Sequence, residues 1–197
     1  QQGFLVLSDL GEHTWLQVLD ADNADALFRQ ALAVLVQMQQ IKVAGSGLPR
    51  YDEALLRREL ELFPDWYVAH ELGVQLDAQQ RQWWQQGCEL LVQAALAQSR
   101  VLVHRDFMPR NLMADASEPG VLDFQDAVIG PISYDVISLF RDAFISWPDE
   151  QVHGWLQHYW QQARNAGLPV PERFASFVVD CDLMGLQRHL KVIGIFA

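Results

Sequence analysis

Apolar residues recur at three- and four-residue intervals along most of the chain, the spacing that keeps side chains on one face of an α-helix. The pattern predicts helices over residues 23–41, 53–63, 79–98, 134–144, 150–166 and 172–196. Asp22 or Asn23 is in position to cap the first helix and Asp52 the second, because short polar side chains accept the free N–H groups of a helix start. Pro64 is expected to stop the second helix.

Short apolar runs bounded by polar turn residues predict strands between these helices. Residues 100–104, 111–113 and 121–124 form one group, in which a turn over residues 115–120 separates the last two. Residues 4–7 predict a further buried strand near the start of the chain. The expected fold class is therefore α+β, mostly helical, with a small sheet.

The composition is that of a globular chain, and the net charge limits the classes of partner that are expected. Half of the 197 residues are hydrophobic and 20% are charged, which supplies enough apolar side chains for a buried core. The formal net charge of -11 argues against nucleic acid or an anionic membrane surface as a partner, since both attract clustered Lys and Arg. No apolar run is long enough to span a bilayer. Cys88 and Cys181 match neither a disulfide framework nor a metal site, and isolated thiols suit a reducing cytoplasm.

Three polar residues lie beside the strands predicted in the middle of the chain. Asp106 closes the triplet that begins with His104, Asn111 comes next, and Asp123 is followed by Phe124. This order and spacing are typical of kinase-type phosphotransferases, in which one aspartate accepts the proton of the attacking hydroxyl. The other two residues supply oxygen ligands to Mg²⁺ against the nucleotide phosphates. Carboxylates at strand ends are expected to converge on one metal cluster.

Residues next to this group separate the chain from protein kinases. Met108 stands where protein kinases carry a Lys, and Gln125 stands where they carry a Gly. The stretch from Asp123 to Asp135 is too short for a regulatory activation loop. A small-molecule acceptor is therefore expected.

The motifs resemble those of the aminoglycoside phosphotransferase and choline kinase-like family of small-molecule kinases. Residues 104–111, 123–127 and 130–135 carry the resemblance. The chain departs from the family pattern in one place, because it lacks the residue usually found between Gly130 and Pro131.

One branch of that family is a closer match. Residues 60–67, 123–127 and 186–196 look like the anomeric amino-sugar kinases of bacterial cell-wall (peptidoglycan) recycling, and the resemblance covers nearly the whole chain. It implies the C-terminal lobe of a protein kinase-like fold, with an inter-lobe strand and connector over residues 1–20 and a helical catalytic lobe over residues 21–197. The chain begins without a Met, so the family's Gly-rich N-terminal lobe is expected elsewhere in the same polypeptide. The chain alone is expected to transfer little or no phosphate.

The resemblance also implies a role for each motif residue. Asp106 would be the catalytic base, and Asn111 and Asp123 would be the ligands of Mg²⁺. His104 would support the loop by packing beneath it and hydrogen-bonding backbone. Asp135 would accept backbone N–H groups of that loop, act as an ordinary helix cap, or do both.

Substrate and nucleotide contacts are expected around these residues. The candidates for contact with the phosphates or the sugar are Arg110, Asp126, Trp66, Arg188 and His189, with Tyr67 and Gln187 adjacent in the sequence. A sugar ring combines an apolar face with hydroxyls, and a lactyl carboxylate would favour an Arg partner. Each candidate has a plainer alternative, as a solvated loop residue, a core aromatic or an ordinary helix side chain. Adenine would lie against the connector at Ser8, Asp9 and Leu10.

The function that the resemblance implies is ATP-dependent phosphorylation of the anomeric hydroxyl of N-acetylmuramate or N-acetylglucosamine. ATP and Mg²⁺ are the expected cofactors, a small-molecule sugar is the expected substrate, and the cytoplasm is the expected location. Two alternatives stay open at this point. One is a kinase of an aminoglycoside or another amino-alcohol, and the other is a non-catalytic kinase-like module.

Overall fold

The structure is a computed structural model that describes Gly3 and residues 8–114 and 119–197. The strand predicted over residues 4–7 lies outside the described residues. Helices dominate the described part of the chain, as the periodicity predicted. The α-helices are α1 Trp15–Val18, α2 Ala24–Gln39, α3 Glu53–Leu62, α4 Ala78–Ala97, α5 Tyr134–Phe140, α6 Asp149–Asn165 and α7 Phe174–Phe196. Among these residues, no helix is long and apolar enough to cross a membrane.

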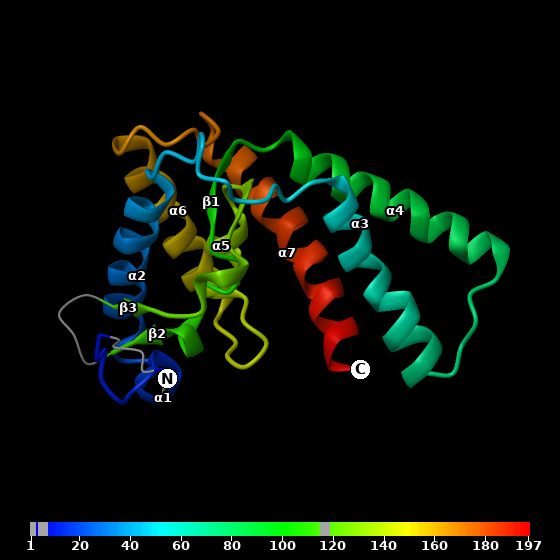
Figure 1. Cartoon of the computed structure of the whole chain (residues 1–197), viewed down its shortest axis with the longest axis horizontal. Coiled ribbons are helices and arrows are strands. Elements are labelled where there is room, and N and C mark those ends of the chain that lie inside the picture. Colours follow the sequence, from blue (N-terminus) through cyan, green and yellow to red (C-terminus); the bar gives the residue numbers. More distant parts are fainter. Residues whose placement is uncertain (1–2, 4–7, 115–118) are drawn as a thin grey trace.

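The long helices pack in two groups that meet at α5 and α7 (Figure 1). On one side α2 packs against α6, and on the other α3 and α4 pack against α7. Phe28 of α2 centres the first group, since its ring lies 5.3 Å from that of Phe140 and 4.6 Å from that of Trp155. The α7 helix also contacts α5, so it joins the two groups into one core.

The strands form two small antiparallel pairs between the helices. Strand β1 (Arg100–Val103) pairs with β4 (Val128–Pro131), and β2 (Leu112–Met113) pairs with β3 (Gly120–Val121). Strand β4 was not predicted, because its short apolar run contains a Gly and a Pro and resembled a turn. Between the strands lie two 3₁₀ turns, η2 (Pro109–Asn111) and η3 (Phe124–Asp126).

Four details differ from the sequence-based expectations. Asn23 precedes α2 but its side chain does not cap the helix; its amide instead donates to the carbonyl of Val18 at 2.8 Å. Helix α3 ends at Leu62, close to Pro64 as predicted, but the chain remains helical and continues directly into the π-helix η1 (Phe63–Glu71). Asp52 caps α3 as predicted, by accepting from the Leu55 N–H at 2.9 Å.

The other two differences concern α5 and the third predicted strand. Helix α5 ends at Phe140, so the segment up to residue 144 is a loop rather than a helix. Strand β3 ends at Val121, and Asp123 instead begins the η3 turn. The predicted carboxylate at the end of this strand therefore lies on a turn.

A close helix crossing explains Gly194 near the end of α7. A Cβ atom at this position would lie 2.4 Å from both the carbonyl carbon and the carbonyl oxygen of Leu62. These are backbone atoms, so an added methyl group would force α7 and the end of α3 apart. We expect Gly194→Ala to lower the free energy of unfolding by about 1–3 kcal/mol, the usual cost of overpacking.

Urea unfolding of the whole protein checks this expectation against Gly87→Ala. Gly87 lies inside α4, and nothing lies within 4 Å of a Cβ built there. Replacing a glycine inside a helix by alanine, where the added methyl group meets no neighbour, raises the free energy of unfolding by roughly 0.5–1 kcal/mol. The two variants should therefore shift the midpoint in opposite directions. Equal midpoints would show that the crossing relaxes without cost.

Candidate active site

The loop after β1 is held in shape by a buried aspartate. Asp135 of α5 is fully buried, and its two carboxylate oxygens accept the backbone N–H groups of His104 at 2.7 Å and Arg105 at 3.0 Å. It lies in the first turn of α5 after Ser133, so it is not the helix cap. These two bonds fix the backbone immediately before Asp106.

The carboxyl group of Asp135 also has an unusually high pKa. Burial raises the pKa of its carboxyl group to about 7, although the two backbone N–H groups and Arg188 act to lower it. The group is therefore protonated in the folded state over a pH range in which it is ionised in the unfolded chain. Its contribution to stability is complete below the ordinary pKa of 3.8 and is lost as the pH rises through about 7.

Asp135→Asn should remove this pH dependence. Relative to the variant, the wild-type protein should be most stable near pH 4 and should lose up to about 1.4 kcal/mol per pH unit toward neutrality. Unfolding midpoints of both proteins between pH 4 and pH 8 test the expectation. Parallel curves for the two proteins would contradict it.

His104 is buried beneath the same loop. Its Nδ1 atom accepts the backbone N–H of Asp106 at 3.3 Å, and its ring lies 6.1 Å from the ring of Phe107. Burial lowers the pKa of His104, partly offset by the negative charges of Asp106 and Asp123. A neutral imidazole that accepts at Nδ1 carries its proton on Nε2. The ring therefore supports the loop from below.

Arg105 adopts a left-handed backbone conformation and points away from the loop. Its φ angle is 76°, which is uncommon for a residue other than Gly and occurs often at functional sites. Its guanidinium forms an ion pair with Glu59 of α3. The loop is thus tied to α5 through its backbone and to α3 through a side chain.

Glu59 is the centre of a buried ionic cluster that the sequence did not reveal. It is 4% exposed, and it pairs with Arg105 and also with Lys191 of α7 at 3.1 Å. The hydroxyl of Tyr51 donates to Glu59, as does the amide of Gln187 at 3.3 Å. Burial opposes ionisation of this carboxyl, but Lys191, Tyr51 and Arg105 together hold its pKa below the ordinary value. Glu59 lies among other charged residues of α3, so no local sequence signal marked it.

Asn111 is bonded to the loop, and the segment that precedes Asp123 is bonded to Asn111. The Asn111 amide nitrogen donates to the backbone carbonyl of Asp106 at 2.9 Å, and the backbone N–H of Leu122 donates to the carbonyl of Asn111 at 2.9 Å. Asp123, like Arg105, has a left-handed backbone, with a φ angle of 70°. Its Oδ1 atom accepts from the side chain of Gln125 at 2.7 Å.

This donor set fits a hard divalent cation. The side-chain nitrogen of Asn111 is engaged by the loop, which leaves its oxygen available, and Asp123 keeps a second carboxylate oxygen. In the described part of the chain, no group of three or more His, Cys, Asp and Glu residues could hold a metal ion by itself. Mg²⁺ commonly binds through one or two protein oxygens together with substrate phosphates, and these two side chains have oxygens of that kind free.

Asp106 opens onto a cavity between the loop and α7. The cavity has a volume of about 360 Å³, near the lower end of the usual range for small-molecule sites, roughly 300–1,000 Å³. Four of the residues singled out in the sequence line it, namely Asp106, Arg110, Asp126 and Arg188. Lys191 and Arg105 line it as well, although neither was predicted to face a substrate.

The remaining sugar candidates lie elsewhere. Trp66 is on η1, 49% exposed, with its ring 5.6 Å from that of His70, and it is not among the described residues that line the cavity. His189 faces a neighbouring apolar cavity together with Tyr67, and its Nε2 atom donates to the carbonyl of Arg141 at 3.2 Å. Gln187 is buried in the Glu59 cluster.

The connector candidates lie beside the second strand pair. Ser8 and Asp9 are exposed, and Asp9 accepts from the backbone N–H of Gly11 at 3.0 Å. Leu10 packs on β3, because a Cβ at Gly120 would lie 3.0 Å from its Cδ1 atom. The absence of a side chain at Gly120 thus lets Leu10 approach the strand pair that lies between Asn111 and Asp123 in the sequence.

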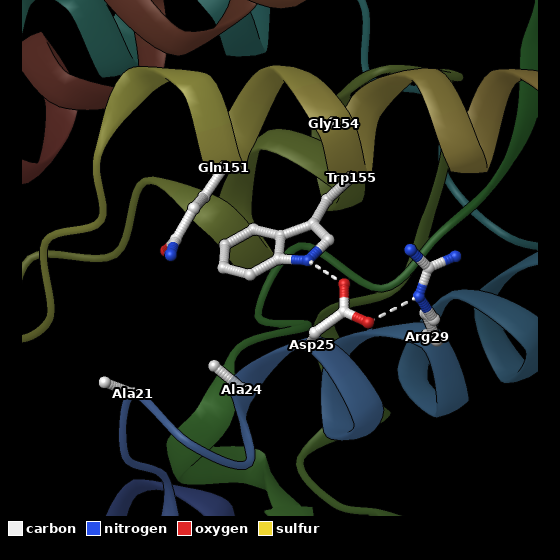
Figure 2. Close-up of a pocket in the computed structure, with 7 residues that line it drawn as sticks. All are labelled: Ala21, Ala24, Asp25, Arg29, Gln151, Gly154 and Trp155. Atoms are coloured by element: carbon white, nitrogen blue, oxygen red, sulfur yellow. Dashed lines mark hydrogen bonds and ion pairs between the residues drawn. The ribbon is translucent and has the colours of Figure 1, made fainter.

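A further cavity lies between α2 and α6, and the carboxylate in its described lining is already paired within the protein (Figure 2). It has a volume of about 210 Å³, and Asp25 is its acidic residue. One Asp25 oxygen accepts from the indole N–H of Trp155 at 3.0 Å, and the other pairs with Arg29 at 2.8 Å (Figure 2). Both oxygens of Asp25 are therefore satisfied within the protein.

Comparison with known proteins agrees with the motifs. Residues 1–177 match the model of the "Phosphotransferase enzyme family". The chain is 57% identical over 197 residues to an N-acetylmuramate/N-acetylglucosamine kinase of Pseudomonas putida, a match that covers all of the chain and 58% of that protein. It is 51% identical over 199 residues to a kinase of the same name from Neisseria meningitidis serogroup B, covering 99% of the chain and 59% of that protein. The chain therefore spans somewhat more than half the length of these relatives.

A solved structure gives the same result for the fold. An ADP-bound aminoglycoside phosphotransferase superposes with a TM-score of 0.53 over 90% of the chain and 69% of its own length, at 17% sequence identity. Such a low identity leaves the fold as the shared feature, and it confirms the predicted mostly helical, kinase-like architecture.

Proposed function

The chain belongs to the phosphotransferase enzyme family, and on that premise we propose that the whole protein transfers the γ-phosphoryl group of ATP to the anomeric hydroxyl of an amino sugar. The two sugars proposed are those in the names of its relatives, N-acetylmuramate and N-acetylglucosamine. The observation that carries the proposal is the position of Asp106, which lies on a loop bonded to Asn111 and at the mouth of a cavity of sugar-binding size.

In this proposal each residue of the site has a separate role. Asp106 orients the sugar hydroxyl and accepts its proton as the oxygen attacks the γ-phosphorus and the bond to ADP breaks. Asn111 and Asp123 would hold Mg²⁺, which offsets the charge that develops on the phosphoryl group. His104 and Asp135 keep the loop in position from below. Arg110 and Asp126 face the acceptor from the walls of the cavity.

Nucleotide binding is proposed to need more of the polypeptide than this chain. Kinases clamp the ATP phosphates with a Gly-rich lobe, and the matched relatives extend well beyond the region that this chain covers. We expect the connector at Ser8, Asp9 and Leu10 to contact adenine through its backbone, with that lobe closing over the phosphates. The reaction is proposed for the cytoplasm, since Cys88 and Cys181 are both free thiols.

A substrate panel tests the proposal. Phosphoryl transfer from ATP by the whole protein is measured on N-acetylmuramate, N-acetylglucosamine, choline and kanamycin. Turnover on the amino sugars is the expected result. Turnover on choline or kanamycin alone would assign the protein to the amino-alcohol kinases, and no turnover on any of the four would favour a non-catalytic module.

A further inference from the structure

Arg188 is a buried cation in the wall of the acceptor cavity. It is 4% exposed, and its hydrogen bond is a long one, from its guanidinium to the carbonyl of Arg141 at 3.4 Å. Within residues 8–114 and 119–197, it forms no ion pair with a carboxylate. Asp135 is near enough to interact with Arg188, but the two form no ion pair, and burial favours the uncharged form of Asp135. A buried charge without a full counter-ion is costly, so the position favours an anion from outside.

The other cations of the cavity are already engaged. Arg105 and Lys191 share Glu59, so one negative charge serves two positive ones. The guanidinium of Arg110 lies 3.9 Å above the ring of Phe144. Among the cations of the described lining, Arg188 therefore differs in having neither a carboxylate in an ion pair nor an aromatic ring as its partner.

The location of Arg188 indicates which ligand supplies the anion. The cavity is lined by Asp106, and its described lining includes neither Asn111 nor Asp123. An anion bound by Arg188 would thus lie in the cavity lined by Asp106, apart from the two residues proposed to hold the metal ion. Such an anion would belong to the substrate that receives the phosphoryl group.

We propose that Arg188 is a specificity-determining residue that binds the carboxylate of an acidic amino sugar. The inference rests on the proposed function and deepens it. N-acetylmuramate carries a lactyl carboxylate where N-acetylglucosamine has a neutral hydroxyl, and a guanidinium holds a carboxylate through two parallel hydrogen bonds. Arg188 would then favour the acidic sugar and contribute little to the neutral one.

The first test compares both sugars in the whole protein carrying Arg188→Gln. We expect kcat/KM for N-acetylmuramate to fall about 10- to 100-fold, the range for a lost charge-assisted pair, while kcat/KM for N-acetylglucosamine stays within about threefold. Arg188→Lys keeps the charge and should recover part of the loss. Arg81→Gln, an exposed residue of α4, is the matched control and should change neither value.

The second test removes the charge of the ligand instead of the charge of the protein. Its first measurement uses wild-type protein, so it remains valid even if a variant folds poorly. Wild-type protein is assayed with the carboxamide of N-acetylmuramate, which should lose the same factor as Arg188→Gln loses on the acid. In the variant, replacing the acid by the amide should cost nothing further, as expected for two groups that act through one contact.

The outcomes separate the two proposals. Equal losses on both sugars, a raised KM for ATP, or full wild-type activity on the carboxamide would overturn the role of Arg188 and leave the kinase activity standing. Wild-type protein that phosphorylates neither sugar would overturn the proposed function, and the role of Arg188 with it.

Discussion

Asp106→Asn should lower the turnover number of the whole protein by about 10²- to 10⁴-fold, the range that a positioned general base contributes. The amide cannot accept the proton of the sugar hydroxyl, yet it has nearly the same size as the carboxylate. The loop should keep its shape, because the Asn111 bond reaches the backbone of Asp106 and the Asp135 bonds reach the residues before it. The loss should therefore appear in kcat, with little change in the KM for ATP.

The measurement is sugar-dependent ADP formation, with Asp149→Asn as the control. Asp149 starts α6, its side chain is 87% exposed, and it pairs with Arg141 at 3.3 Å away from the loop. This control should behave like the wild-type protein. A variant of Asp106 that keeps more than a tenth of the wild-type kcat would show that another group accepts the proton.

Glu59→Gln should destabilise the protein by about 3–5 kcal/mol, the cost of breaking a buried ion pair on one side. Glutamine can still accept from Tyr51, but it leaves the partly buried Arg105 and Lys191 without a counter-ion. Since Arg105 immediately precedes Asp106, we also expect a loss in kcat at temperatures at which the variant remains folded.

Urea unfolding at several pH values tests this expectation. The pKa of Glu59 is held below the ordinary value of 4.5, so its contribution is complete above that pH and is lost as the pH falls. The difference between wild type and variant should shrink accordingly in acid. Glu53→Gln removes an exposed glutamate that pairs with Arg57 on the same helix, and it should leave the midpoint almost unchanged. Equal effects of the two substitutions would refute the role of the buried cluster.

The helices illustrate what the sequence could predict. The boundaries of α4, α6 and α7 follow from apolar periodicity within two residues, because a helix face is set by neighbours three and four positions apart. Pro64 did not predict the π-helix that follows α3, since whether the chain stays helical past a proline depends on the local hydrogen-bond ladder and not on the residue alone. Strand β4 was missed for a related reason: its ladder is completed by β1, a partner distant along the chain.

The same distinction between local and long-range determinants applies to the candidate site. The sequence by itself determined which residues are proposed for the chemistry, because Asp106, Asn111 and Asp123 lie within one short segment whose spacing is characteristic. Only the tertiary structure decided that Glu59 binds Arg105, that Arg188 is buried in the wall of the acceptor cavity and that Trp66 lies outside its lining. These contacts join α3 and α7 to a loop 46 or more residues away, and no local pattern encodes a pairing between such distant residues. The residues proposed for proton transfer and metal binding could be chosen from the sequence, whereas the arrangement proposed to select the substrate required the fold.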